Sequence, residues 1–99
     1  MKQGILMVLR KNKIHSHIDS MADEILGYIK EKEQFFDDRW VPAKDIRNDL
    51  ELNFVSVPKN NIQYGKKGWL FAILARMLED NSLVEFNKVN GSSFYRSVS

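Results

Sequence analysis

The last third of the chain passes from a helical pattern directly into the pattern of a β-hairpin. Two stretches of alternating apolar and polar residues flank the dipeptide Asn90-Gly91. Asn-Gly favours a tight type I′ turn, because both central residues of that turn need a positive φ. Pairing about this turn places Phe86 opposite Tyr95, which is a favourable cross-strand aromatic pair. Residues 83–98 are therefore predicted to form a hairpin that follows a helix.

The helix before the hairpin is predicted from apolar residues at steps of three and four, which build one buried stripe. The stripe consists of Leu70, Ile73, Leu74, Met77 and Leu78. The helix is expected to start between Asn61 and Gly68. Asn81 and Ser82 are expected to end it, since asparagine tolerates the left-handed conformation at a helix C-terminus.

The same periodicity predicts a long first helix. Its apolar residues are Ile14, Ile18, Met21, Ala22, Ile25, Leu26 and Ile29. Asp19 or Ser20 is a suitable N-cap, an earlier start stays open, and the helix is expected to run to about Gln34. Phe35 and Phe36 are then expected to enter the core.

A shorter second helix is predicted to begin at Pro42, because proline suits the first turn, where its missing N–H costs nothing. Its apolar residues are Ala43, Ile46 and Leu50. The stretch from Phe54 to Gly65 is rich in asparagine and is predicted to be a loop, and a short strand at residues 54–57 stays open.

The composition sets the class of protein. A chain of 99 residues, of which 43% are hydrophobic and 28% charged, has the size and composition of one globular domain. The absence of cysteine excludes disulfides, thiolate zinc sites and cysteine nucleophiles, and it favours a cytoplasmic protein. The apolar run from Ile5 to Leu9 is too short to span a membrane, and no signal peptide is predicted.

No residue pattern predicts catalysis or a cofactor. The sequence has no glycine-rich phosphate loop, no nucleophile elbow and no convincing Ser/His/Asp spacing, so an enzyme is not expected. His15 and His17 would share one face of a strand, but no third ligand is evident beyond Asp19, so no metal site is predicted.

Charged residues are unevenly distributed, although the net charge is only +2. Residues 20–53 contain nine acidic and five basic residues, whereas residues 54–78 contain four basic residues and no acidic one. A polyanion would therefore be met by the C-terminal half of the chain, and the acidic middle would face away from it.

Two segments resemble a known family. Residues 41–52 (VPAKDIRNDLEL) resemble helix two of bacterial winged helix-turn-helix regulators, and residues 75–85 (ARMLEDNSLVE) resemble the passage from the recognition helix into the wing. The resemblance implies an α+β fold that is mostly α, with three helices and a small C-terminal hairpin as the wing. Residues 1–19 would be an N-terminal arm and residues 20–99 the winged helix domain. The family usually has three or four residues between helices two and three, whereas about a dozen are expected here.

By this resemblance the start of helix three would enter the major groove of DNA, and the wing would contact phosphates. The residues predicted to contact DNA are polar or basic: Asn60, Asn61, Gln63, Tyr64, Lys66 and Lys67 near the helix start, and Lys88, Asn90, Ser92 and Arg96 in the wing. Arg96 also falls opposite Glu85, which could occupy its guanidinium.

Trp69 and Phe71 cannot both be buried on the predicted stripe, so they are the candidates for binding a protein partner.

The sequence thus predicts a sequence-specific DNA-binding protein, a small bacterial, phage or plasmid transcription regulator that acts by occupying an operator. No cofactor, small-molecule ligand or membrane contact is expected. A homodimer stays open, with residues 1–19 as its contact element, because one small module buries little DNA surface. The alternative is a winged helix module that binds a protein instead of DNA. A weaker alternative is an RNA-binding module that stacks bases on Tyr64, Trp69 or Tyr95.

Overall fold

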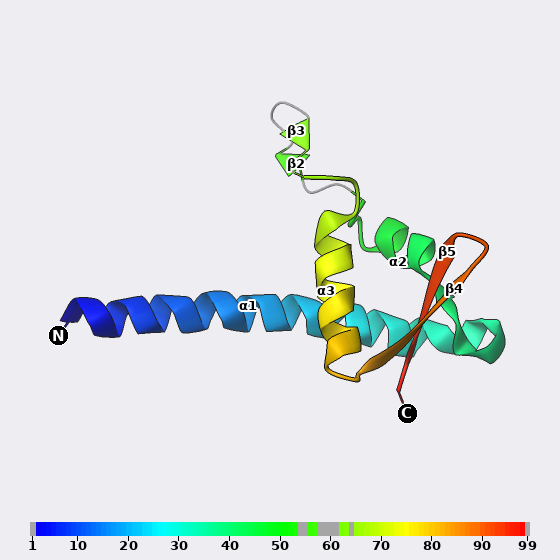
Figure 1. The fold of residues 1–99 in the computed structure, drawn as a ribbon, viewed down its shortest axis with the longest axis horizontal. Coiled ribbons are helices and arrows are strands. Elements are labelled where there is room, and N and C mark those ends of the chain that lie inside the picture. The colour runs from blue at the N-terminus through cyan, green and yellow to red at the C-terminus, as the bar shows by residue number, and fades with distance from the viewer. Residues whose placement is uncertain (1, 54–55, 58–61, 64, 99) are drawn as a thin grey trace.

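The computed structural model describes residues 2–53, 56–57, 62–63 and 65–98 of the chain. In chain order their elements are α1 (Lys2–Lys32), the 3₁₀ helices η1 (Glu33–Phe35) and η2 (Asp37–Arg39), β1 (Val41–Pro42), α2 (Ala43–Asp49), β2 (Ser56–Val57), β3 (Ile62–Gln63), α3 (Trp69–Asp80), β4 (Val84–Val89) and β5 (Ser92–Ser97). The fold is mostly helical with a small three-stranded antiparallel sheet, so it belongs to the α+β class, as predicted (Figure 1).

The helix α1 is continuous over 31 residues, and its N-terminal half extends far beyond the rest of the molecule (Figure 1). At 1.5 Å per residue it is about 46 Å long, which accounts for most of the 55 Å longest dimension of the molecule. The N-cap expected at Asp19 or Ser20 is wrong, because residues 2–19 continue the same helix; residues 6–13 include six good helix formers and no glycine or proline. The predicted boundary between an arm and a domain therefore falls inside α1.

The end of α1 lies close to its predicted position, since the helix passes into η1 after Lys32. Phe36 packs against the core, as expected. Phe35, however, is 72% exposed, so its predicted burial is wrong. Its ring lies beside α1 with the Lys32 ammonium 5.9 Å from the ring centroid, which is a surface contact.

The sheet has the strand order β1-β5-β4, and both neighbouring pairs are antiparallel. The predicted hairpin register is confirmed: Phe86 pairs with Tyr95, and their ring centroids lie 5.2 Å apart. Asn90 and Gly91 have φ values of 50° and 82°, as the predicted turn requires. Strand β1 has no sequence signal, because a pair of residues is too short to show alternation. Its pairing with β5 joins the hairpin to the segment before α2.

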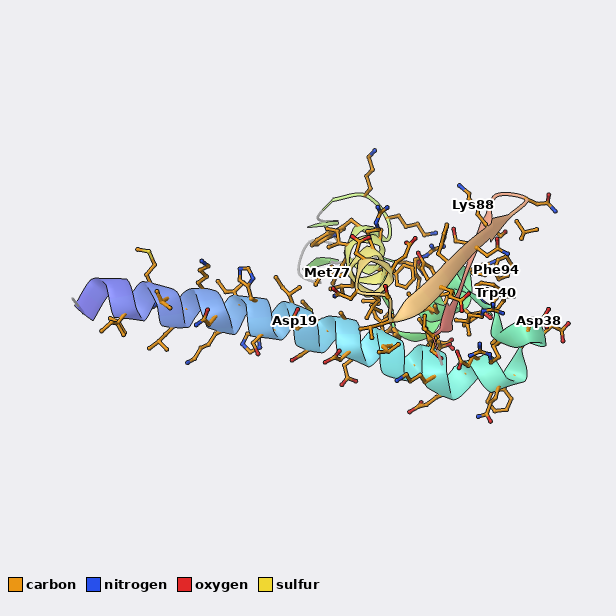
Figure 2. All side chains as sticks on the ribbon, turned by 60° about the horizontal axis from the view of Figure 1, so that its bottom comes forward. Asp19, Asp38, Trp40, Met77, Lys88 and Phe94 are labelled. Atoms are coloured by element: carbon orange, nitrogen blue, oxygen red, sulfur yellow. The ribbon has the colours of Figure 1, made fainter. Side chains whose placement is uncertain are left out.

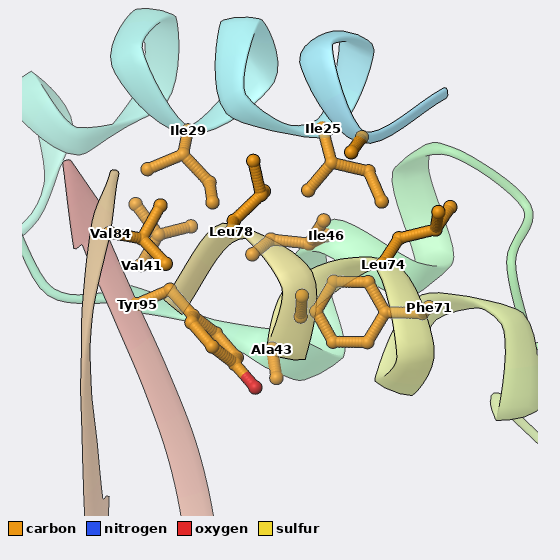
Figure 3. Close-up of a cluster of buried hydrophobic side chains, with 12 residues drawn as sticks. Ile25, Ile29, Val41, Ala43, Ile46, Phe71, Leu74, Leu78, Val84 and Tyr95 are labelled. Atoms are coloured by element: carbon orange, nitrogen blue, oxygen red, sulfur yellow. The ribbon is translucent and has the colours of Figure 1, made fainter. Parts of the chain in front are cut away.

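One cluster of buried apolar side chains lies where the three helices meet the sheet (Figure 3). Ile25 and Ile29 enter it from α1, Ile46 from α2, Leu78 from α3 and Val84 from β4, and none of them is more than 3% exposed. The part of α1 that reaches this cluster, residues 18–32, is called the packed half below. Residues 2–17 are called the projecting half.

The buried side of α3 differs from the predicted stripe. The buried residues of α3 are Phe71, Leu74, Ala75 and Leu78. Ile73 was expected among them but is 52% exposed, so this prediction is wrong. The helix is turned so that the Phe71 ring enters the core, where it meets the Tyr95 ring edge-on with the centroids 5.7 Å apart. Burying the larger aromatic side chain removes more apolar surface from water.

Both ends of α3 lie near their predicted positions. Gly68 precedes the first residue, Trp69, and the last residue is Asp80. Ser82, with a φ of 59°, takes the left-handed conformation that was expected at Asn81, whose φ is −87°. The chain therefore reverses one residue later than expected and then enters β4.

A carboxylate joins the end of α1 to the end of β5. Glu33 accepts hydrogen bonds from the Ser97 backbone N–H (2.8 Å), the Ser97 hydroxyl (2.7 Å) and an Arg39 guanidinium nitrogen (3.2 Å). Burial opposes the ionisation of Glu33, but these hydrogen bonds outweigh it and lower the pKa of the carboxyl. The ionised carboxylate thus holds the last strand of the sheet against the helical layer.

Candidate nucleic-acid interface

The connection between α2 and α3, residues 50–68, is longer than in the family pattern. Part of it forms a second, two-stranded sheet in which Ser56 pairs with Gln63 and Val57 pairs with Ile62. Figure 1 shows that this small hairpin projects beyond the start of α3, on the side of the molecule opposite α1. The short strand left open at residues 54–57 is therefore present at residues 56–57.

Polar contacts tie the end of α2 to the start of α3. Arg47 Nε donates to Asn53 Oδ1 (3.3 Å), and the Gly68 N–H donates to the Asn53 backbone oxygen (2.7 Å). Gly68 has a φ of 76°, and a Cβ at this position would lie 3.2 Å from the Arg47 side chain. Both the conformation and the space therefore favour glycine. These contacts hold the end of α2 close to the start of α3, although the β2–β3 hairpin is inserted between them.

The two aromatic residues proposed for partner binding are placed differently. Phe71 is 3% exposed, so it belongs to the core and offers no surface to a partner; this part of the prediction is wrong. Trp69 is half-buried. Its indole lies over Gly65, where an added Cβ would approach the ring to 2.8 Å. Trp69 thus packs on the turn that begins α3 and keeps part of its surface exposed.

The outer face of α3 contains few groups that could recognise base edges. Ala72 and Ile73 are exposed and apolar. Arg76 is also exposed, but its Nε donates to Asp80 Oδ1 at 2.9 Å one turn further along the helix. The polar groups suited to base contacts must therefore come from the residues before the helix.

Two of the predicted contacts near the start of α3, Lys66 and Lys67, are exposed in the turn directly before the helix. Gln63 lies on β3, paired with Ser56. The remaining three candidates, Asn60, Asn61 and Tyr64, lie outside the described residues.

Three of the predicted wing contacts lie at the tip of the β4–β5 hairpin. Lys88 pairs with Ser93 just before the turn, Asn90 is in the turn, and Ser92 begins β5. Lys88, Asn90 and Ser92 are exposed, and Figure 2 shows Lys88 on the hairpin, well away from α1.

The fourth predicted wing contact, Arg96, is occupied within the chain. Its guanidinium donates to Glu85 Oε2 (3.2 Å) and to the Asp38 backbone oxygen (3.0 Å). The same group lies over the Trp40 ring, 4.1 Å from the centroid. The predicted pairing with Glu85 is confirmed, and Arg96 is better described as the residue that attaches β5 to η2 than as a phosphate ligand.

Several elements on the side of the molecule opposite α1 contain exposed lysines. Figure 1 shows the start of α3, the helix α2 and the tip of the β4–β5 hairpin on this side. We call the exposed lysines of these elements the basic surface: Lys44, Lys66, Lys67 and Lys88. Lys44 was not among the predicted DNA contacts, because its neighbours in α2 include the acidic residues Asp45 and Asp49. A groove between α2 and the hairpin tip is lined by Lys44, Asp45 and Arg47 on one side and by Gly91 and Ser92 on the other.

The two tyrosines with raised pKa values lie in packing contacts. Burial, and a hydrogen bond donated to the Asp49 carboxylate, raise the pKa of Tyr28. Burial also raises the pKa of Tyr95. In the part of the chain that the structure describes, no three His, Asp or Glu side chains are grouped so that they could hold a metal ion. His15 and His17 lie on α1, about 200° apart around the helix axis, and not on a strand.

None of the helices among the described residues combines the length and the apolarity that a membrane span requires.

No protein-family model, curated protein or solved structure matches this chain. The arrangement of the chain's own residues is therefore what indicates its function.

Proposed function

We propose that this chain is a winged helix-turn-helix protein that binds double-stranded DNA sequence-specifically and regulates transcription by occupying an operator. In this proposal α2 and α3 are the helix-turn-helix pair, and the β4–β5 hairpin is the wing. The observation that carries the proposal is the basic surface, whose lysines come from α2, the start of α3 and the hairpin. These are the elements that such a fold would present to a duplex.

The distribution of acidic residues supports this orientation. The packed half of α1 contains four exposed acidic residues: Asp19, Asp23, Glu24 and Glu31. The helix itself lies on the side of the molecule opposite α2, the start of α3 and the tip of the β4–β5 hairpin (Figure 1). A polyanion is attracted to the lysines and repelled by this acidic helix, so the electrostatic field favours one docking face.

Base recognition would depend on the segment before α3. Lys66 and Lys67 could reach the O6 and N7 acceptors of guanine in the major groove or a flanking phosphate. The start of α3, a helix of 12 residues, is the positive end of the helix dipole, which favours a phosphate as well. At the wing, Lys88, Asn90 and Ser92 would contact the backbone and set the register.

The test is fluorescence anisotropy with a random duplex DNA pool over a salt series. Binding should weaken steeply with salt, because lysine–phosphate contacts release counterions. Lys66→Glu and Lys88→Glu should each weaken binding and lower the slope of log K against log[salt] by roughly one unit. Lys30→Glu is the matched control, because it changes the net charge equally but lies on α1.

Two results would contradict the proposal. One is the absence of binding by the wild-type chain at low salt. The other is an equal loss of affinity in Lys30→Glu and Lys66→Glu, which would mean that only the net charge matters. If the salt dependence and the variant affinities are as expected, repeated selection of bound duplexes from the pool identifies the DNA sequence that the protein prefers.

A second function, binding of a protein partner, is favoured by one observation. The outer face of α3 exposes Ile73 (52%) beside the half-buried Trp69. An apolar side chain at the centre of a proposed recognition helix suits a protein surface better than a base edge. This function predicts no affinity for duplex DNA at low salt, so the same experiment separates the two.

A further inference from the structure

The projecting half of α1 contains a segment that is apolar on every side. Ile5, Leu6, Met7, Val8 and Leu9 are consecutive, and each is between 51% and 70% exposed. Five consecutive residues cover the whole circumference of a helix, since each advances by about 100°. Figure 2 shows that the part of α1 before Asp19 lies away from the rest of the molecule, with side chains on both sides of the helix. A helix that is apolar all round is normally buried, so this segment needs contacts on more than one side.

A stripe of exposed apolar residues continues from this segment into the packed half. Met7, Ile14 and Met21 are spaced by seven residues, close to two helical turns, so they lie on one line along α1. They are 70%, 59% and 39% exposed. The stripe is symmetric about Ile14. It therefore matches a second, antiparallel copy of itself.

The Met21 end of the stripe lies in an apolar groove on the body of the molecule. The groove lies between α1, the segment that follows α2, and α3. Its apolar lining consists of Met21, Ile25, Leu50, Leu52, Leu70 and Leu74. Glu24 contributes a carboxylate to the same groove.

We propose that two copies of this chain form an antiparallel dimer through α1, with Ile14 at the two-fold axis. Met7 of each copy packs against the partner's Met21, and the apolar segment of each copy occupies the groove of the other. The segment then contacts α1 of the partner on one side and the Leu50 and Leu70 side of the groove on another. This arrangement explains why the segment is apolar all round, and it closes on itself with the same surface used twice.

The charges along α1 select the antiparallel orientation. Residues 2–13 contain four basic residues and no acidic one, whereas residues 19–24 contain three acidic residues and no basic one. In an antiparallel pair centred on Ile14, the acidic residues 19–24 of each copy lie along the apolar residues 4–9 of the other, between the partner's Lys2 and the partner's Arg10. A parallel pair would place like charges opposite each other along both segments, which disfavours it.

Dimerisation is tested first by sedimentation velocity of the full chain over a concentration series without DNA, so the result does not depend on the proposed function. The wild-type chain should form a dimer. Ile14→Glu should weaken dimerisation at least tenfold, because it places two carboxylates together at the axis. Ser16→Glu is the matched control: it adds the same charge to the opposite face of α1, about 200° away, and should leave dimerisation unchanged.

Far-UV circular dichroism verifies that both variants keep the wild-type helix content, which is expected because Ile14 and Ser16 are exposed. A wild-type chain that stays monomeric at its highest soluble concentration overturns the proposal. Dimerisation of Ile14→Glu with wild-type affinity overturns it as well.

Disulfide crosslinking tests the orientation, since the chain has no cysteine of its own. In the antiparallel dimer the two copies of residue 7 lie fourteen residues apart along the pair, or about 21 Å, too far for a disulfide. Met7→Cys alone should therefore not crosslink, whereas a mixture of Met7→Cys and Met21→Cys should form mixed dimers. Efficient crosslinking of Met7→Cys to itself would indicate a parallel pair and overturn the proposal.

Discussion

The two halves of α1 belong to one unbroken helix, yet the packed half contacts the hydrophobic core and the projecting half does not. The projecting half contains five large apolar residues in a row, all of them more than half exposed. The packed half buries only Ala22, Ile25 and Ile29, with Ile18 and Leu26 partly buried against the same core. These buried positions follow steps of three and four, so they form a single stripe that one surface can cover.

The difference shows that spacing, and not the amount of apolar surface, decides which part of a helix packs on its own domain. The single apolar stripe of the packed half is buried against α3 and the sheet. A segment that is apolar on all sides would need neighbours in several directions, and one small domain supplies them only along the packed half. The following predictions test this comparison, from the largest expected effect to the smallest.

The largest contrast should come from shortening one isoleucine in each half. Ile29→Ala, at a position only 1% exposed, should lower the free energy of unfolding by about 2–5 kcal/mol, because it removes buried methyl groups and leaves a cavity. Ile14→Ala, at a position 59% exposed, should change it by less than about 0.5 kcal/mol in dilute protein. Urea denaturation measures both, and similar losses in the two variants would contradict the comparison.

A smaller loss is expected where the packed half ends. Glu33→Gln removes a carboxylate that accepts three hydrogen bonds, and it should lower the free energy of unfolding by roughly 1.5–3 kcal/mol at neutral pH. Glu31→Gln is the matched control, because Glu31 is exposed on the last turn of α1, two residues before Glu33. Equal effects of the two substitutions in urea denaturation would show that the hydrogen bonds of Glu33 contribute nothing specific.

The Glu33 contact also predicts a pH dependence. Folding lowers the pKa of this carboxyl from its usual 4.5, so its stabilising contribution is complete above that pH. The contribution is lost as the pH falls below 4.5 and through the lower folded-state pKa. The stability difference between wild type and Glu33→Gln should therefore shrink in acid, and a constant difference from pH 7 to pH 3 would contradict this reading.

The smallest effect concerns the glycines of α1. Added Cβ atoms at Gly4 and Gly27 would meet nothing within 4 Å, so neither alanine is hindered. Gly27→Ala should raise the free energy of unfolding by about 0.5–1 kcal/mol, because alanine favours the helix that the packed half must form on folding. Gly4→Ala should raise the helix signal in circular dichroism but leave the global unfolding midpoint nearly unchanged. An equal rise in the midpoint for both would mean that the projecting half unfolds together with the core.

Much of the local structure could be predicted from particular residues. Asn90-Gly91 gave the turn and the register of the hairpin, since its conformation is set by the two residues themselves. The periodicity from Ile18 to Ile29 located the packed half. The start of the first helix was misplaced, because Asp19 is an acceptable N-cap that a continuing helix does not need.

The candidate site was only partly predictable. Lys66, Lys67 and Lys88 were identified from charge and position, and the structure leaves them exposed. Lys44, which is exposed on α2, was not among the predicted contacts. Arg96 was predicted to contact phosphate, whereas the structure shows it in contact with Trp40 and Asp38. Those partners are distant in the sequence, so no local pattern indicates them.

The sequence by itself determined the hairpin turn, the helical segments and the absence of cysteine chemistry, because these depend on neighbouring φ/ψ preferences and on residue type. Tertiary structure decided which face of α3 is buried, and it placed Phe71 inside and Ile73 outside by packing the larger ring on Tyr95. It also placed α2, the start of α3 and the tip of the β4–β5 hairpin on the side opposite α1 (Figure 1), and among the described residues it left the projecting half of α1 outside the core. These outcomes depend on competition among distant apolar surfaces for one small core, and a local sequence pattern does not contain the result of that competition.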